Sequence, residues 1–171
     1  MDKKLVALSK KLLNAQLKKN DLSVSYRTLN HYDSMNILIS NREDSKKWRR
    51  FNAIEFVWIE LVMILREIGM PISKILHLKN RLFDEGKEGS IDKANFINKS
   101  FEEEIFLSII NKYELYILVF NDSSYTFHDS DSLQQWHNGI YKNEPHINIP
   151  LTNIINEAIS KIDNLSPIIP S

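Results

Sequence analysis

The chain has 171 residues, of which 43% are hydrophobic and 26% charged, values that suit one large or two small soluble domains. It contains no cysteine, which excludes disulfides, thiolate nucleophiles and cysteine-based zinc or haem sites. The formal net charge of zero hides an uneven distribution. Residues 1–75 hold 14 Lys/Arg and 8 Asp/Glu, whereas the remainder holds 8 and 14, so a basic half that suits nucleic acid precedes an acidic half.

The sequence does not indicate insertion into a membrane or secretion. Its most apolar stretch, residues 51–70, is interrupted by Glu55, Glu60, Arg66 and Glu67, which argues against a membrane-spanning helix. The N-terminus lacks the apolar run and the small-residue cleavage site of a signal peptide. We therefore expect a cytoplasmic protein without a membrane partner, and the absence of cysteine agrees with a reducing compartment.

The first elements in chain order are two amphipathic helices and a charged hairpin. Leucines at helical spacing predict a helix over residues 5–17, and a polar linker leads to a second helix over residues 25–36. Short apolar ends around a very polar loop then predict a small β-hairpin over residues 39–51.

Two further helices follow the hairpin. Asn52 and Glu55 have the spacing of a capping box, so a third helix is expected to begin there. Gly69 is expected to end it and Pro71 to start a fourth helix, over residues 72–83, because glycine is favoured just beyond a helix and proline in its first turn.

The third helix carries more apolar surface than one buried face requires. Phe56, Ile59 and Met63 form a stripe away from its main apolar arc. If these side chains stayed in water, the protein would lose roughly 1.5–3 kcal/mol of burial free energy for each of them. We therefore expect the C-terminal half or a partner subunit to cover the stripe.

A glycine-containing polar segment, residues 84–90, predicts a boundary between a domain over residues 1–84 and another over residues 85–171. Beyond it we expect helical structure over residues 91–111, then strands over residues 113–120 and 125–128 joined by a tight turn. A short helix over residues 129–138, a last strand over residues 146–149, a last helix over residues 151–162 and a loose tail over residues 165–171 should follow. The predicted fold is mostly α with small β elements, an N-terminal winged helix-turn-helix followed by a small α+β domain.

Three segments resemble the MerR family of transcription regulators. Residues 24–33, Val-Ser-Tyr-Arg-Thr-Leu-Asn-His-Tyr-Asp, are similar to its recognition-helix signature, Val-Ser-x-Arg-Thr-Leu-x-x-Tyr-Glu. Residues 48–51 resemble the Tyr-Arg-x-Tyr of its wing, and residues 65–70 its Leu-Arg-Glu-Leu-Gly-Phe. The resemblance spans residues 24–82 and implies a sequence-specific regulator that binds double-stranded DNA and is not an enzyme.

The resemblance also implies a DNA-binding surface. The second helix would enter the major groove, where Arg27, Asn30 and His31 could read base edges. The hairpin would serve as a wing whose cations neutralise phosphates. In the family, the residues that match Arg27, Tyr32, Arg42 and Arg49 touch DNA. The complete predicted contact set is Ser25, Tyr26, Arg27, Thr28, Asn30, His31, Tyr32, Arg42, Lys46, Lys47, Arg49 and Arg50.

Two departures from the family pattern affect local geometry and assembly. Asn36 replaces a glycine after the recognition helix, which is acceptable because asparagine tolerates a left-handed backbone. The long helix through which members commonly dimerise would meet the polar segment at residues 84–89 and break. A homodimer on a two-fold site is still expected, with residues 90–162 carrying the dimer contact.

The acidic half has no catalytic or cofactor motif, so we expect no catalytic residue and no cofactor. We also expect no metal site, because histidines near polar turns such as His128, His137 and His146 are usually structural. Two roles stay open for this half: binding an apolar or aromatic effector, or forming a dimer or partner interface. The alternative functions are a DNA-organising or excisionase-like protein, or a protein-interaction module without an effector.

Overall fold

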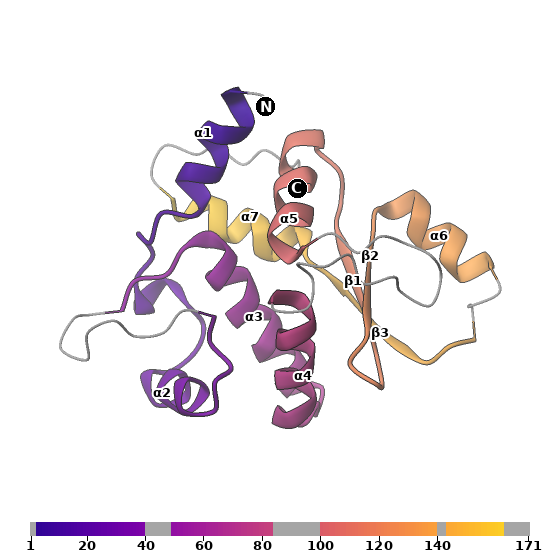
Figure 1. Cartoon of the computed structure of the whole chain (residues 1–171), viewed down its shortest axis with the longest axis horizontal. Coiled ribbons are helices and arrows are strands. Elements are labelled where there is room, and N and C mark those ends of the chain that lie inside the picture. Colours follow the sequence, from indigo (N-terminus) through magenta and orange to yellow (C-terminus); the bar gives the residue numbers. More distant parts are fainter. Residues whose placement is uncertain (1–2, 40–48, 84–99, 140–142, 163–171) are drawn as a thin grey trace. The chain divides into compact units, whose positions relative to one another are not determined.

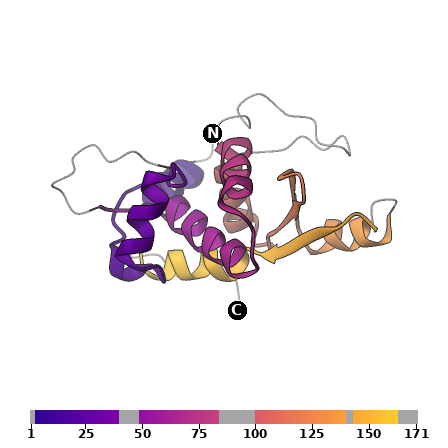
Figure 2. The same ribbon diagram turned by 90° about the horizontal axis from the view of Figure 1, so that it is seen from below.

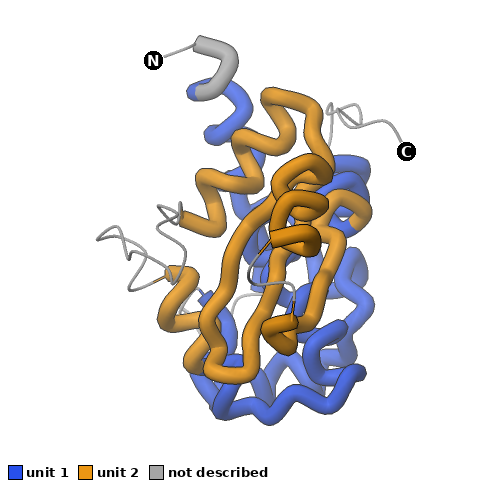
Figure 3. Tube along the Cα trace, turned by 90° about the vertical axis from the view of Figure 1, so that its right-hand side faces the viewer, with its two compact units in different colours: residues 1–76, 154–167 blue, residues 77–153, 168–171 orange. Residues whose placement is uncertain are grey.

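The structure is a computed structural model that describes residues 3–39, 49–83, 100–139 and 143–162. Helices dominate, and the described residues contain one three-stranded sheet, which confirms the predicted fold class (Figures 1 and 2). The chain divides into two compact units (Figure 3). Unit 1 comprises residues 1–76 and 154–167, and unit 2 comprises residues 77–153 and 168–171.

Unit 1 contains α1 (Lys3–Leu12), the 3₁₀ turn η1 (Lys19–Asp21), α2 (Tyr26–Ser34) and α3 (Ala53–Glu67), and α4 (Ile72–Phe83) begins in it. The first predicted helix is too long, because it ends at Leu12 and not at residue 17. Leu17 instead pairs with Phe51 in an antiparallel bridge, with N···O distances of 3.0 and 2.9 Å. An extended pairing of this kind is incompatible with a helical backbone at Leu17.

Local signals set the ends of the helices in unit 1. The capping box at α3 is confirmed, since Asn52 and Glu55 each accept a hydrogen bond from the other's backbone N–H at 2.8 Å. Asn36 has φ 56° directly after α2, and the N–H of Ile37 donates to the carbonyl of Tyr32, so the expected left-handed turn is present. Gly69, with φ 90°, ends α3 in the same way.

The core of unit 1 is built around α3. Trp58 is fully buried, and its indole Nε1–H donates to the carbonyl of Ile37 at 2.8 Å. This bond holds the segment that follows α2 against α3. Because α2 carries the predicted recognition residues, the placement of that helix depends on a core side chain as well as on its own caps.

The apolar stripe of α3 is largely covered, in part by the C-terminal segment, as predicted, and in part by α2 of the same unit. Phe56 and Ile59 are buried, and Met63 is half-buried with the Tyr32 hydroxyl 3.7 Å from its sulfur. The ammonium of Lys161, just beyond α7 (Thr152–Ser160), lies 4.8 Å from the centroid of the Phe56 ring. The C-terminal segment therefore contributes to this cover.

Lys161 also connects the end of the chain to the start of the helix-turn-helix. Its Nζ donates to the carbonyl of Asp21 at 2.5 Å and pairs with the carboxylate of Glu157. Figures 1 and 2 show the end of α7 beside α3. Residues 154–167 thus belong to unit 1, although they are far in sequence from its other residues.

Unit 2 contains α5 (Phe101–Asn111), β1 (Tyr116–Phe120), β2 (Tyr125–His128), α6 (Ser130–Asn138) and β3 (His146–Pro150). The strands are antiparallel in the order β2-β1-β3, and the turn before β2 has Ser123 at φ 63°. Leu118, Phe120 and Trp136 form one apolar cluster with Leu133 beside it. The predicted elements from residue 101 onward are therefore confirmed, with shifts of a few residues at their ends.

Several predictions fall outside the described residues. They are most of the hairpin over residues 39–51, the boundary segment at residues 84–90, the helical stretch over residues 91–99 and the tail at residues 165–171. The domain division at residue 84 stays a prediction.

A buried histidine makes the stability of unit 2 depend on pH. Burial lowers the pKa of His128, Asp129 opposes the shift, and His137 and His146 add to it. The unfolded chain therefore binds a proton more readily than the folded one, and stability should fall as the pH drops below about 6.5. Urea unfolding at a series of pH values from about 7 to 5 measures this. His128→Gln is the control, and an equal pH dependence in that variant would assign the effect to other groups.

Candidate nucleic-acid interface

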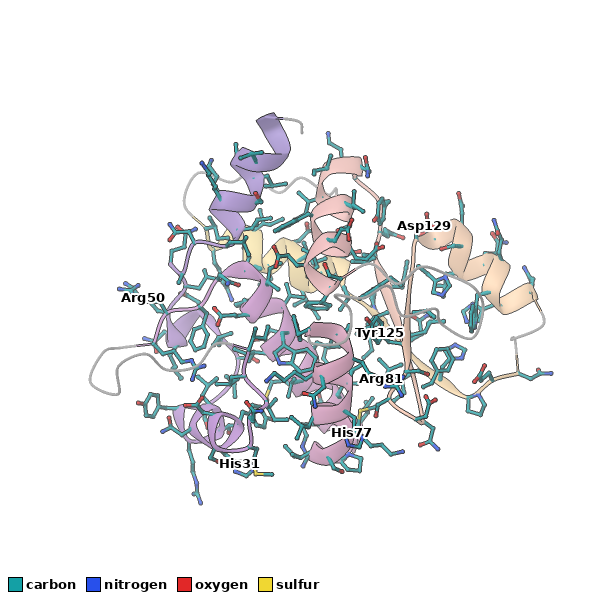
Figure 4. The ribbon with its side chains drawn as sticks, in the orientation of Figure 1. His31, Arg50, His77, Arg81, Tyr125 and Asp129 are labelled. Carbon is teal, nitrogen blue, oxygen red and sulfur yellow. The ribbon has the colours of Figure 1, made fainter. Side chains whose placement is uncertain are left out.

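The outer face of α2 is polar and exposed. The hydroxyl of Ser25 caps the helix by accepting from the N–H of Thr28 at 3.1 Å, and the two hydroxyls lie 2.8 Å apart. Arg27, Asn30 and His31 are all exposed, and His31 is marked on this helix in Figure 4. Residues three and four apart share one side of a helix, so these three side chains form a single surface that could reach base edges.

Tyr26 and Tyr32 differ in their placement on α2. Tyr26 is 47% exposed, whereas Tyr32 is 4% exposed and packs inward with Leu29. Burial raises the pKa of Tyr32, and its hydroxyl contacts the sulfur of Met63. The structure therefore gives Tyr32 a packing role and separates it from the exposed members of the predicted contact set.

The base of the predicted wing is attached to α2. A guanidinium nitrogen of Arg49 lies 2.9 Å from the carboxylate of Asp33, and the same guanidinium stacks over Phe51 at 5.6 Å. Arg49 thus orients the segment after the predicted wing relative to α2. Arg50 is more exposed, and it donates to the carbonyl of Gln16 at 3.3 Å (Figure 4).

A cavity of about 180 Å³ lies within this surface, at the junction of η1, α2 and the wing base. Four cations and one carboxylate, Asp33, are among its lining residues. The cations are Lys18, Lys19, Arg49 and Arg50. This concave basic surface next to an exposed polar helix face is suited to a phosphate backbone.

Lys18 and Lys19 were missed by the sequence prediction. Both lie in the polar linker that precedes the second predicted helix, where the basic charge of the N-terminal half is the only signal for them. The η1 turn, together with the pairing of Leu17 and Phe51, brings them to the cavity. Arg42, Lys46 and Lys47 lie outside the described residues.

Residues 19–82 match the family described as MerR HTH family regulatory protein. This chain carries a MerR-type helix-turn-helix domain. The matched segment runs from η1 through α2 and α3 to α4 and leaves out α1. Neither a curated protein nor a solved structure matches the chain.

The MerR-type domain makes this protein a DNA-binding transcription regulator. The exposed face of α2 and the basic cavity both belong to the matched segment, apart from Lys18 at its edge. None of the helices in the described ranges could span a lipid bilayer.

Proposed function

We propose that the MerR-type domain binds a specific sequence of double-stranded DNA, with α2 in the major groove and residues 39–51 as the wing. The observation that carries this proposal is the exposed polar face of α2 next to a cavity lined by four cations. A major groove about 12 Å wide admits one helix, and cations beside that helix can reach the phosphates that border the groove.

The proposed contacts divide into two classes. Arg27, Asn30 and His31 read base edges, because they are exposed on the same face of α2 and have suitable donors and acceptors. The four cations of the cavity and the side chains of Ser25, Tyr26 and Thr28 contact the phosphate backbone of the DNA. Arg49 has a second task, since its ion pair with Asp33 keeps the wing base against α2.

The protein acts as a homodimer in which the α+β half has its own role. A homodimer places two copies of α2 on the two halves of a palindromic site. The α+β half provides the dimer contact or receives an effector.

Substitution of Arg27 and Arg50 by alanine should separate base reading from phosphate binding. Arg27→Ala should cost about 1–3 kcal/mol on the preferred site and little on random duplex. Arg50→Ala should weaken binding to both and reduce the slope of log K against log salt by about 1. A site selected from random oligonucleotides, titrated at two salt concentrations, supplies both measurements.

Arg81→Ala is the matched control, because Arg81 is an exposed cation of α4 outside the cavity. Its affinity should equal that of the unmodified protein. Wild-type affinity in both Arg27→Ala and Arg50→Ala would reject the proposed face.

A further inference from the structure

Two histidines that are nine residues apart in sequence meet in unit 2. His137 lies in the last turn of α6, and His146 is the first residue of β3. Their Nε2 atoms are 3.4 Å apart, with ring centroids at 5.5 Å and an angle of 24° between the ring planes. The two imidazoles therefore present their Nε2 atoms to each other.

The other ring nitrogen of His146, Nδ1, already has a hydrogen-bond partner. Its Nδ1 lies 2.7 Å from the carbonyl oxygen of Glu144. A carbonyl only accepts, so Nδ1 carries the hydrogen, and the neutral ring keeps a lone pair on Nε2. A histidine that binds a metal usually donates its second N–H to a backbone carbonyl or a carboxylate in this way.

The separation of the two Nε2 atoms also fits a shared ligand. Bonds of about 2.0–2.1 Å from a tetrahedral zinc ion place two of its nitrogen ligands about 3.3–3.4 Å apart. The same distance also allows a long N–H···N hydrogen bond between the two rings, which is the alternative that the experiment below distinguishes. Packing supports the position of His146, whose ring lies 5.8 Å from that of Phe120.

We propose that His137 and His146 form a binding site for one divalent transition-metal ion of the class that favours imidazole, such as Zn²⁺. In the described parts of the chain, no group of three or more His, Asp or Glu side chains is arranged to hold a metal ion. The exposed side of His137 leaves room for water as a further ligand. The bound ion links α6 to β3. This proposal departs from our expectation of no metal site and is independent of the proposed DNA contacts.

Calorimetric titration of Zn²⁺ into the metal-free, full-length protein tests the site. We expect one ion per chain. His137→Gln and His146→Gln should each weaken binding at least about tenfold, because each removes one of the two protein ligands. Zn²⁺ should also raise the melting temperature of the unmodified protein, and raise that of His137→Gln clearly less at the same zinc concentration, since stabilisation depends on the affinity of the folded state for the ion.

His77→Gln is the matched control, because His77 is an exposed histidine of α4 away from the pair. Its zinc affinity should equal that of the unmodified protein. His137 is itself exposed, so its variant is expected to fold, which circular dichroism without metal checks. Absence of zinc binding, or equal affinity in the unmodified protein and both pair variants, would overturn the proposal and leave a hydrogen bond between two imidazoles.

Discussion

Replacement of Trp58 by alanine should lower the free energy of unfolding by about 3–5 kcal/mol. The side chain is fully buried in α3, so its removal leaves a cavity in the core of unit 1. Trp58→Phe should cost less, about 1–3 kcal/mol, because most of the packing remains and the carbonyl of Ile37 loses its donor. Urea unfolding followed by circular dichroism measures both values.

Ile68→Ala is the matched control for Trp58, since Ile68 follows the same helix and is 52% exposed. Its effect should stay within about 0.5 kcal/mol. The Trp58→Phe variant also connects stability with function, because Ile37 follows the left-handed turn that ends α2. We expect weaker binding to specific DNA in this variant even where it remains folded. Equal losses in Trp58→Phe and Trp58→Ala would assign the whole effect to the hydrogen bond.

Removal of residues 154–171 should unfold most of unit 1. Four isoleucines of this C-terminal segment are buried: Ile154, Ile155, Ile159 and Ile162. The first of them is also the first residue of the segment that belongs to unit 1. At about 1.5–3 kcal/mol for each buried isoleucine, their loss is comparable with the about 5–15 kcal/mol that stabilises a typical domain. The shortened protein also loses Lys161 and its contacts with Phe56 and Asp21. Helical content and DNA binding should therefore fall together.

A variant that ends at Ile162 is the matched control for this truncation, since it keeps the four buried isoleucines named above. It should unfold at nearly the same urea concentration as the full chain. The experiment also tests the predicted domain of residues 1–84. A stable, DNA-binding protein without residues 154–171 would show that this domain folds without the C-terminal segment.

The sequence alone determined those features that depend on neighbouring residues. The capping box of Asn52 and Glu55, the left-handed turn at Asn36 and the stop at Gly69 were predictable because each rests on hydrogen bonds or torsion angles within a few residues. Apolar periodicity located the helices, and a sequence signature indicated the MerR-type domain before its fold was known. These signals all lie within short stretches of chain.

Only the tertiary structure decided which distant residues meet. Tyr32 matched a family contact position, yet its ring is buried against α3. The pairing of Leu17 with Phe51 ended α1 early and brought Lys18 to the basic cavity. Lys161 reached the start of the helix-turn-helix from the far end of the chain. The meeting of His137 with His146 was equally invisible in the sequence. The physical reason is the same in each case, because long-range packing and chain reversal set these contacts, and neither leaves a periodic or local pattern in the sequence.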